Sequence, residues 1–144
     1  MKRFLTLILF SLLIPIQNSS AAPSLEETID FLINGDDDAT WNYLSTKEDW
    51  SIDGCILTMS GRGISGDIET QRYDLNKVIV QTIKPTYDGL GFIGDCKGEC
   101  RSVIGNNVSS PMKEWWVKNK ITWERNVKAL SHLYSNFCEG ASTF

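Results

Sequence analysis

The sequence predicts an α+β fold in which a short N-terminal helix precedes an antiparallel β-sheet, arranged as a meander, and a long C-terminal amphipathic helix packs on that sheet. A helix-capping pattern near the start, alternating apolar residues in the middle and an apolar stripe at helical spacing in the last third predict these parts. Two disulfides are expected to brace the fold. The chain has 144 residues, and the 123 that follow the leader predicted at 1–21 have a length that suits one domain with one core.

The first residues predict a secretory signal peptide. A positive start at Lys2 and Arg3 precedes a nearly unbroken apolar run, and small residues follow it. We expect cleavage after about Ala21, hence a signal peptide at 1–21 and a single α+β domain at 22–144. Because the apolar run is shorter than the ~20 residues that span a bilayer, we expect no membrane span in the mature protein. The predicted location is secreted or periplasmic.

The charge balance bears on the partners. Once Lys2 and Arg3 leave with the leader, 12 of the 14 basic residues remain against 18 acidic residues, a net charge of −6. An acidic surface is repelled by nucleic acid phosphates and by anionic membranes. We therefore expect no nucleic acid as a partner. The charge does not identify the partner, which we expect to be a protein or a small ligand, and we expect no cofactor.

The chain has four cysteines, Cys55, Cys96, Cys100 and Cys138, and all four belong to the predicted mature region. An even number in an exported chain predicts two disulfides, for which three pairings are possible. We favour Cys96–Cys100, because Gly98 allows the chain to reverse, and that choice leaves Cys55–Cys138. A redox centre or a zinc site fits less well, since neither Cys-x-x-Cys nor two short cysteine knuckles are present.

A capping box predicts a short helix of about ten residues after the leader. Ser24 supplies the cap, Glu27 completes the box three residues later, and Asn34-Gly35 is a typical C-terminal stop. The apolar residues that share one face of this helix are Leu25, Ile29, Leu32 and Ile33.

Three consecutive aspartates, Asp36, Asp37 and Asp38, follow this helix. Adjacent carboxylates diverge, whereas calcium loops alternate their ligands, so we expect a solvated loop and no metal site. These aspartates are also the named candidates for an alternative function, a small secreted hydrolase that uses carboxylates.

The middle of the chain predicts strands. Cys55, Leu57 and Met59 alternate with more polar residues, and a second strand is expected over 68–75. The β-branched run at 78–83 predicts a third strand, which Pro85 ends. We expect 89–93 and 101–104 to form a hairpin whose tip the Cys96–Cys100 disulfide closes.

The last third predicts a long helix, with Ser110 as the cap and Pro111 at the first helical position. Trp115 and Trp116 would lie about 100° apart on this helix, so we expect one of them to line a groove or stay exposed. The apolar stripe consists of Trp116, Trp123, Val127, Leu130, Tyr134 and Phe137.

The segments "DGCILTMS" and "RNVKALSHLYSNFC", in this order after a helix, resemble small exported bacterial domains with a pleckstrin-homology-like (PH-like) sheet and a C-terminal helix. The resemblance covers most of the mature chain. It implies a scaffold of that type and no particular reaction, and it assigns no functional residue.

The sequence names no catalytic residue. Its single histidine, His132, is expected on the helix surface with Lys128 and Arg125, and disulfides would leave no thiol as a nucleophile. We therefore predict a small exported binding or structural domain. The candidate binding residues are Trp115 and Trp116 and the stapled turn Lys97, Gly98 and Glu99.

Overall fold

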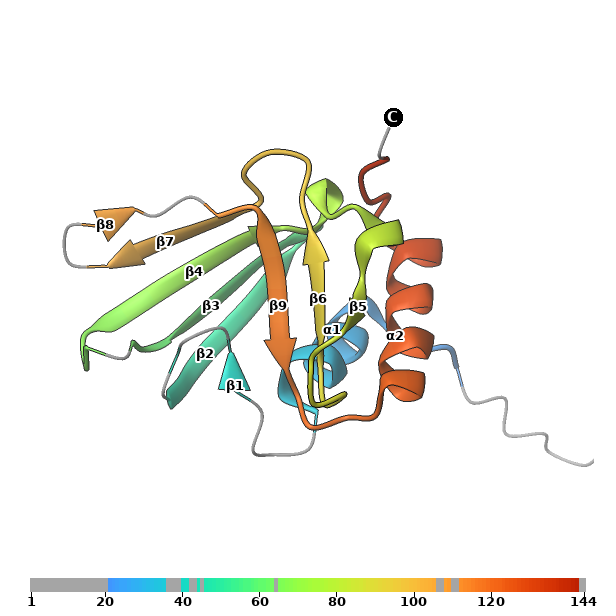
Figure 1. Cartoon of the computed structure of the whole chain (residues 1–144), viewed down its shortest axis with the longest axis horizontal. Helices are drawn as coiled ribbons and strands as arrows, with labels where there is room; N and C mark the ends of the chain where they lie inside the picture. Colours follow the sequence, from blue (N-terminus) through green and yellow to red (C-terminus); the bar gives the residue numbers. More distant parts are fainter. Residues whose placement is uncertain are drawn as a thin grey trace, which may run out of the picture.

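The structure is a computed structural model that describes residues 21–35, 40–41, 44, 46–63, 65–105, 108–109 and 112–142. These residues form two antiparallel sheets and two α-helices, arranged as Figure 1 shows, so the predicted α+β class is confirmed. The elements in chain order are α1 (Leu25–Asn34), β1 (Thr40–Trp41), β2 (Thr46–Asp53), β3 (Ile56–Arg62), β4 (Ile68–Asp74), the 3₁₀ turns η1 (Leu75–Lys77) and η2 (Val80–Thr82), β5 (Lys84–Pro85), β6 (Phe92–Asp95), β7 (Arg101–Gly105), β8 (Val108–Ser109), β9 (Glu114–Lys118) and α2 (Trp123–Asn136).

The strands form two sheets where the sequence suggested one. In the described part of the chain, one sheet has four strands in the order β1-β9-β6-β5, and the other has five in the order β2-β3-β4-β7-β8. In Figure 1, β6 and β9 run across the direction of β3 and β4, and α1 lies behind them. The five-stranded sheet is a meander from β2 through β4, in keeping with the predicted meander, and β2 is a strand that was not predicted.

The N-terminal helix begins and ends as predicted. The Ser24 hydroxyl accepts a hydrogen bond from the Glu27 backbone at 3.1 Å, and the Glu27 carboxylate accepts one from the Ser24 backbone at 2.7 Å. Gly35 follows the helix with a φ of +53°. There a side chain would collide with the backbone oxygen of Asn119, so glycine ends the helix for steric reasons as well.

The core lies where α1, α2 and both sheets meet. Burial of each large apolar side chain contributes roughly 1.5–3 kcal/mol. The indole N–H of Trp115 finds no hydrogen-bond partner within the described residues, so this side chain acts through packing, including an edge contact with Phe92 at 4.7 Å between ring centroids. Fully buried members are Ile29, Leu32, Ile33, Leu57, Met59, Tyr73, Phe92, Trp115, Val117 and Leu133.

The predicted strand at 78–83 is wrong. Val78 and Ile79 make only isolated bridges, and the chain then turns through η2. Ile79 donates its backbone N–H to Asp95 at 2.8 Å, while Val78 accepts from Ala141 at 2.7 Å. These two partners are distant in sequence, and their contacts override the β-propensity of the run.

The predicted hairpin between 89–93 and 101–104 is also wrong. β6 pairs with β5 and β9 in one sheet, whereas β7 pairs with β4 and β8 in the other. The segment between them is therefore a crossover from sheet to sheet. Its cysteines pair with the chain before β9, where Cys96 donates to Lys113 at 2.9 Å.

The C-terminal helix is shorter than predicted, because α2 begins at Trp123 and 114–118 is the strand β9. Trp115, Val117, Asn119 and Ile121 are all buried, which is the alternation of a strand and its extension. The proposed cap at Ser110 and Pro111 lies outside the described residues.

Both predicted disulfides are present. Cys55 and Cys138 join the turn between β2 and β3 to the end of α2, with 5.8 Å between their Cα atoms. Cys96 and Cys100 close the crossover loop, also with a Cα separation of 5.8 Å. The predicted signal peptide at 1–21 lies, apart from Ala21, outside the described residues, as do Asp36, Asp37 and Asp38.

Candidate functional site

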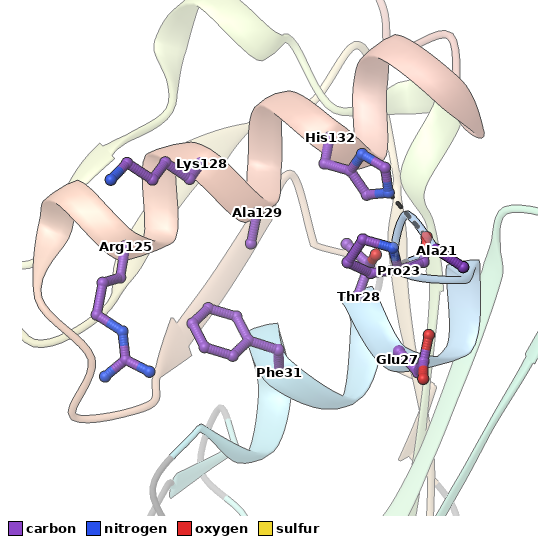
Figure 2. Close-up of a pocket in the computed structure, with 9 residues that line it drawn as sticks. All are labelled: Ala21, Pro23, Glu27, Thr28, Phe31, Arg125, Lys128, Ala129 and His132. Carbon is purple, nitrogen blue, oxygen red and sulfur yellow. Dashed lines mark hydrogen bonds between the residues drawn. The ribbon is translucent and has the colours of Figure 1, made fainter. Parts of the chain in front are cut away.

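A groove runs between α1 and α2, and Figure 2 shows the side chains that line it. Its volume is about 650 Å³, enough for a small molecule or a few residues of a peptide. The lining residues are Ala21, Pro23, Glu27, Thr28 and Phe31 from the N-terminal segment and α1, and Arg125, Lys128, Ala129 and His132 from α2.

The floor of the groove is mainly apolar. Thr28 is buried, and Phe31 and Ala129 are half-buried. Ala129 faces the groove with a single methyl group, so the two helices leave a hollow between them instead of closing on each other (Figure 2). Phe31 lies outside the apolar face that the sequence assigns to α1, and this displaced aromatic was the available signal for the groove.

Two cations project from α2 at one end of the groove (Figure 2). The Arg125 guanidinium lies 5.2 Å from the centroid of the Phe31 ring, a cation–π distance. The Lys128 ammonium lies 3.3 Å from Glu124, with both side chains more than 70% exposed. An ion pair with that exposure stabilises little, so Lys128 can exchange Glu124 for another anion at small cost.

His132 closes the opposite end of the groove and ties it to the N-terminal segment. Its Nε2 lies 2.8 Å from the Pro23 carbonyl oxygen, which can only accept. Its Nδ1 lies 3.0 Å from the Asn136 amide nitrogen, which can only donate. A tautomer that carries its proton on Nε2 satisfies both contacts. His132 therefore orders the segment before α1, and both of its nitrogens are engaged in doing so.

Glu27 lies at the same end as His132 (Figure 2). The backbone hydrogen bond from Ser24, reinforced by the Ser24 side chain, holds the pKa of Glu27 below its usual value. Its carboxylate is therefore ionised and bound to the helix cap. The groove thus has a cationic end at Arg125 and Lys128, an apolar middle and an anionic end.

None of the five binding residues expected from sequence lines this groove. Trp115 is fully buried and offers no contact surface, whereas Trp116 is half-buried on the other face of β9. Lys97, Gly98 and Glu99 are exposed in the crossover loop. The loop is fastened to η1, because the Lys97 N–H donates to the Lys77 carbonyl at 2.8 Å and the Lys77 ammonium donates to the Glu99 carbonyl at 3.1 Å.

The described residues contain no group of three or more His, Cys, Asp or Glu side chains placed to hold a metal ion. All four cysteines are in disulfides. The aspartates at 36–38, the candidates for carboxylate-based hydrolysis, lie outside the described residues, so that alternative stays a prediction.

Comparison of the chain with protein-family models, with curated proteins and with solved structures finds no match. The resemblance to PH-like domains therefore stays a prediction. In the part of the chain that the structure describes, no helix combines the length and apolar character that crossing a membrane requires.

Proposed function

We propose that the protein is an exported binding domain whose groove between α1 and α2 captures a small amphiphilic carboxylate. The observation that carries this proposal is the juxtaposition of an apolar floor, formed by Phe31 and Ala129, with the cations of Arg125 and Lys128. Two disulfides and the apolar leader support export, because disulfides persist mainly outside the cytoplasm.

Each half of such a ligand has a matching part of the groove. An apolar body gains about 25 cal/mol for each Å² removed from water over Phe31 and Ala129. A carboxylate suits the planar donor fork of Arg125, and charge-assisted hydrogen bonds are the strong ones. Glu27 at the opposite end sets the orientation, since it repels the carboxylate and favours the cationic end.

The test is calorimetric titration of the mature protein with decanoate, with decylamine as the probe of equal length and opposite charge. We expect decanoate to bind and decylamine to bind at least tenfold more weakly. The double variant Arg125→Gln/Lys128→Gln should weaken decanoate binding by about ten- to a hundredfold, the range expected for lost charge-assisted hydrogen bonds.

The matched control is Lys113→Gln, which removes one cation at an exposed position outside the groove. It should bind decanoate as the unmodified protein does. Chemical shifts of Phe31 and Ala129 should move on titration. If decanoate does not bind, or binds the double variant equally well, the groove has another function.

A further inference from the structure

A second hollow lies on the face of the four-stranded sheet that is turned away from α1. Thr86, Tyr87 and Asp88 of the turn between β5 and β6 line it, together with Trp116 and Lys118 of β9, and its volume is about 210 Å³. Trp116 and Lys118 are two positions apart, so their side chains share one face of β9, opposite to the buried Trp115. In Figure 1 the β5–β6 turn and the end of β9 lie together at the lower edge of the sheet.

The hollow presents aromatic surface to solvent. Tyr87 is fully exposed, at 110% of its reference area, the highest value among the exposed large apolar residues. Trp116 is half-buried beside it, and the neighbouring Leu90 is 36% exposed. A single exposed aromatic is ordinary, but tyrosine and tryptophan gathered in one hollow are typical of binding surfaces.

The turn that carries Tyr87 is held rigidly. The Asp88 carboxylate accepts hydrogen bonds from the Thr86 hydroxyl at 2.8 Å and from the Leu90 N–H at 3.2 Å. The Gly89 N–H donates to the Thr86 carbonyl at 2.9 Å, and Asp88 forms an ion pair with Lys118. Because the backbone is already ordered, a ligand at this turn loses little affinity to the cost of ordering it.

The charges of the hollow cancel, since Asp88 and Lys118 are paired with each other. An ionic ligand would have to break that ion pair. A neutral polar ligand can instead donate to the outer lone pairs of Asp88 and accept from the outer protons of Lys118. Hydroxyl groups of Thr86 and Tyr87 add further donors and acceptors. A matching ligand has apolar C–H faces that pack against the aromatic rings. It also has hydroxyl groups at its edges that form hydrogen bonds with the polar groups.

We infer that this hollow binds a neutral carbohydrate, with sugar rings lying against Tyr87 and Trp116 and sugar hydroxyls bonded to Asp88 and Lys118. Sugar rings offer the required combination, because their C–H bonds contact aromatic faces while their hydroxyls exchange hydrogen bonds with charged groups. The site shares no lining residue with the groove between α1 and α2. It therefore does not depend on the proposed function, and both sites can be occupied together.

The test is NMR titration of the ¹⁵N-labelled mature protein with cellohexaose, maltohexaose and chitohexaose as neutral probes and with hexagalacturonate as the anionic probe. We expect at least one neutral probe to shift the Trp116 indole resonance and to bind at least tenfold more tightly than hexagalacturonate. Tyr87→Ala should weaken that binding by about tenfold or more, within the range for loss of one aromatic contact.

Tyr87→Ala leaves the core untouched, because the side chain is fully exposed. Ile68→Ala is the matched control, since Ile68 is 53% exposed on the other sheet, and it should bind as the unmodified protein does. The inference is overturned if all three neutral probes leave the Trp116 indole unmoved, if hexagalacturonate binds as well as they do, or if Tyr87→Ala binds with unchanged affinity. Decanoate binding serves as an independent readout, and Tyr87→Ala should not alter it.

Discussion

At the residue scale, two buried asparagines hold the junction between β9 and α2. The Asn119 amide donates to the Leu32 carbonyl at 2.8 Å and to the Asn126 side-chain oxygen at 2.6 Å. The Asn126 amide donates to the Ile121 carbonyl at 3.1 Å. Both asparagines are fully buried, so each of these bonds satisfies a polar group that water cannot reach. The pair also connects α1 to α2.

Replacing Asn126 with leucine should therefore destabilise the protein. The substitution keeps the approximate size of the side chain but leaves the Ile121 carbonyl without its side-chain donor and removes one partner of Asn119. Each buried group left unpaired costs about 1–3 kcal/mol, so we expect the free energy of unfolding to fall by roughly 2–4 kcal/mol in urea titration. Ser135→Ala, at an exposed position of the same helix, should change the free energy of unfolding by no more than about 0.5 kcal/mol. Equal stability of the two variants would show that the network is dispensable.

Asp88 predicts a pH dependence at the same scale. The hydrogen bond from Lys118, followed by those from Thr86 and Leu90, lowers the pKa of Asp88 from 3.8 to about 2. The folded state therefore holds this proton less tightly than the unfolded chain does. The contribution of the Asp88 carboxylate to stability is fully present above about pH 4 and is lost as the pH falls to about 2.

An NMR titration of the side-chain carboxyl carbons measures this pKa directly. Lys118→Met should raise the pKa of Asp88 toward its usual value, because the largest cause of the shift is removed. Lys113→Met, at an exposed position outside the turn, should leave it unchanged. In unfolding experiments, the difference between Asp88→Asn and the unmodified protein should shrink between pH 4 and pH 2. If Lys118→Met leaves the pKa of Asp88 unchanged, the ion pair between the two side chains is contradicted.

At the element scale, β9 separates the two neighbouring tryptophans. Trp115 points into the core and Trp116 points to the outer face. Trp115→Ala should lower the free energy of unfolding by roughly 3–5 kcal/mol, as expected for loss of a large core side chain. Trp116→Ala should lower the free energy of unfolding clearly less, because removal of a half-buried side chain leaves a smaller cavity. Denaturant unfolding measures the loss of stability in each variant. If the two losses are similar, Trp115 and Trp116 do not lie on opposite faces of a strand.

The elements that the sequence predicted are those encoded by local contacts. The capping box of Ser24 and Glu27 needs only four consecutive residues, and the alternation of Leu57 and Met59 reports one buried strand face. The failures at 78–83 and at 114–118 have the opposite cause. Their backbone partners lie far away in the chain, and Trp116 fits a helical stripe as well as a strand.

The two candidate sites could not be predicted from the sequence for a similar reason, because each combines residues that lie far apart in the chain. The groove combines Phe31 of α1 with Arg125 and Ala129 of α2, and only the packing of the two helices brings them together. Grouping His132 with Lys128 and Arg125 was possible because helical spacing alone places them on one face. Trp116, which lines the second hollow, was named as a binding candidate from the sequence but on a predicted helix, and Tyr87 reaches the hollow only through the pairing of β5 with β6.

At the scale of the whole molecule, the two disulfides restrict different lengths of the chain. The Cys55–Cys138 bridge spans 83 positions and joins the β2–β3 turn to the end of α2, so it restricts most of the chain. The Cys96–Cys100 bridge spans 4 positions and shapes the crossover between the sheets. In the chain-entropy model, stabilisation grows with the length of the closed loop, to about 4.5 kcal/mol for the long loop and about 2 kcal/mol for the short one.

Removing the bridges one at a time tests this division. Cys55→Ala/Cys138→Ala should lower the free energy of unfolding by about 4.5 kcal/mol, a large part of the roughly 5–15 kcal/mol typical of a domain. Cys96→Ala/Cys100→Ala should cost about 2 kcal/mol and leave the fold intact, with the local change confined to the crossover. Denaturant unfolding under non-reducing conditions gives both values. Alanine is used in all four positions because a serine hydroxyl would add a buried polar group at Cys138. If loss of the short bridge lowers the free energy of unfolding more than loss of the long bridge does, loop length does not determine how much each bridge stabilises this protein.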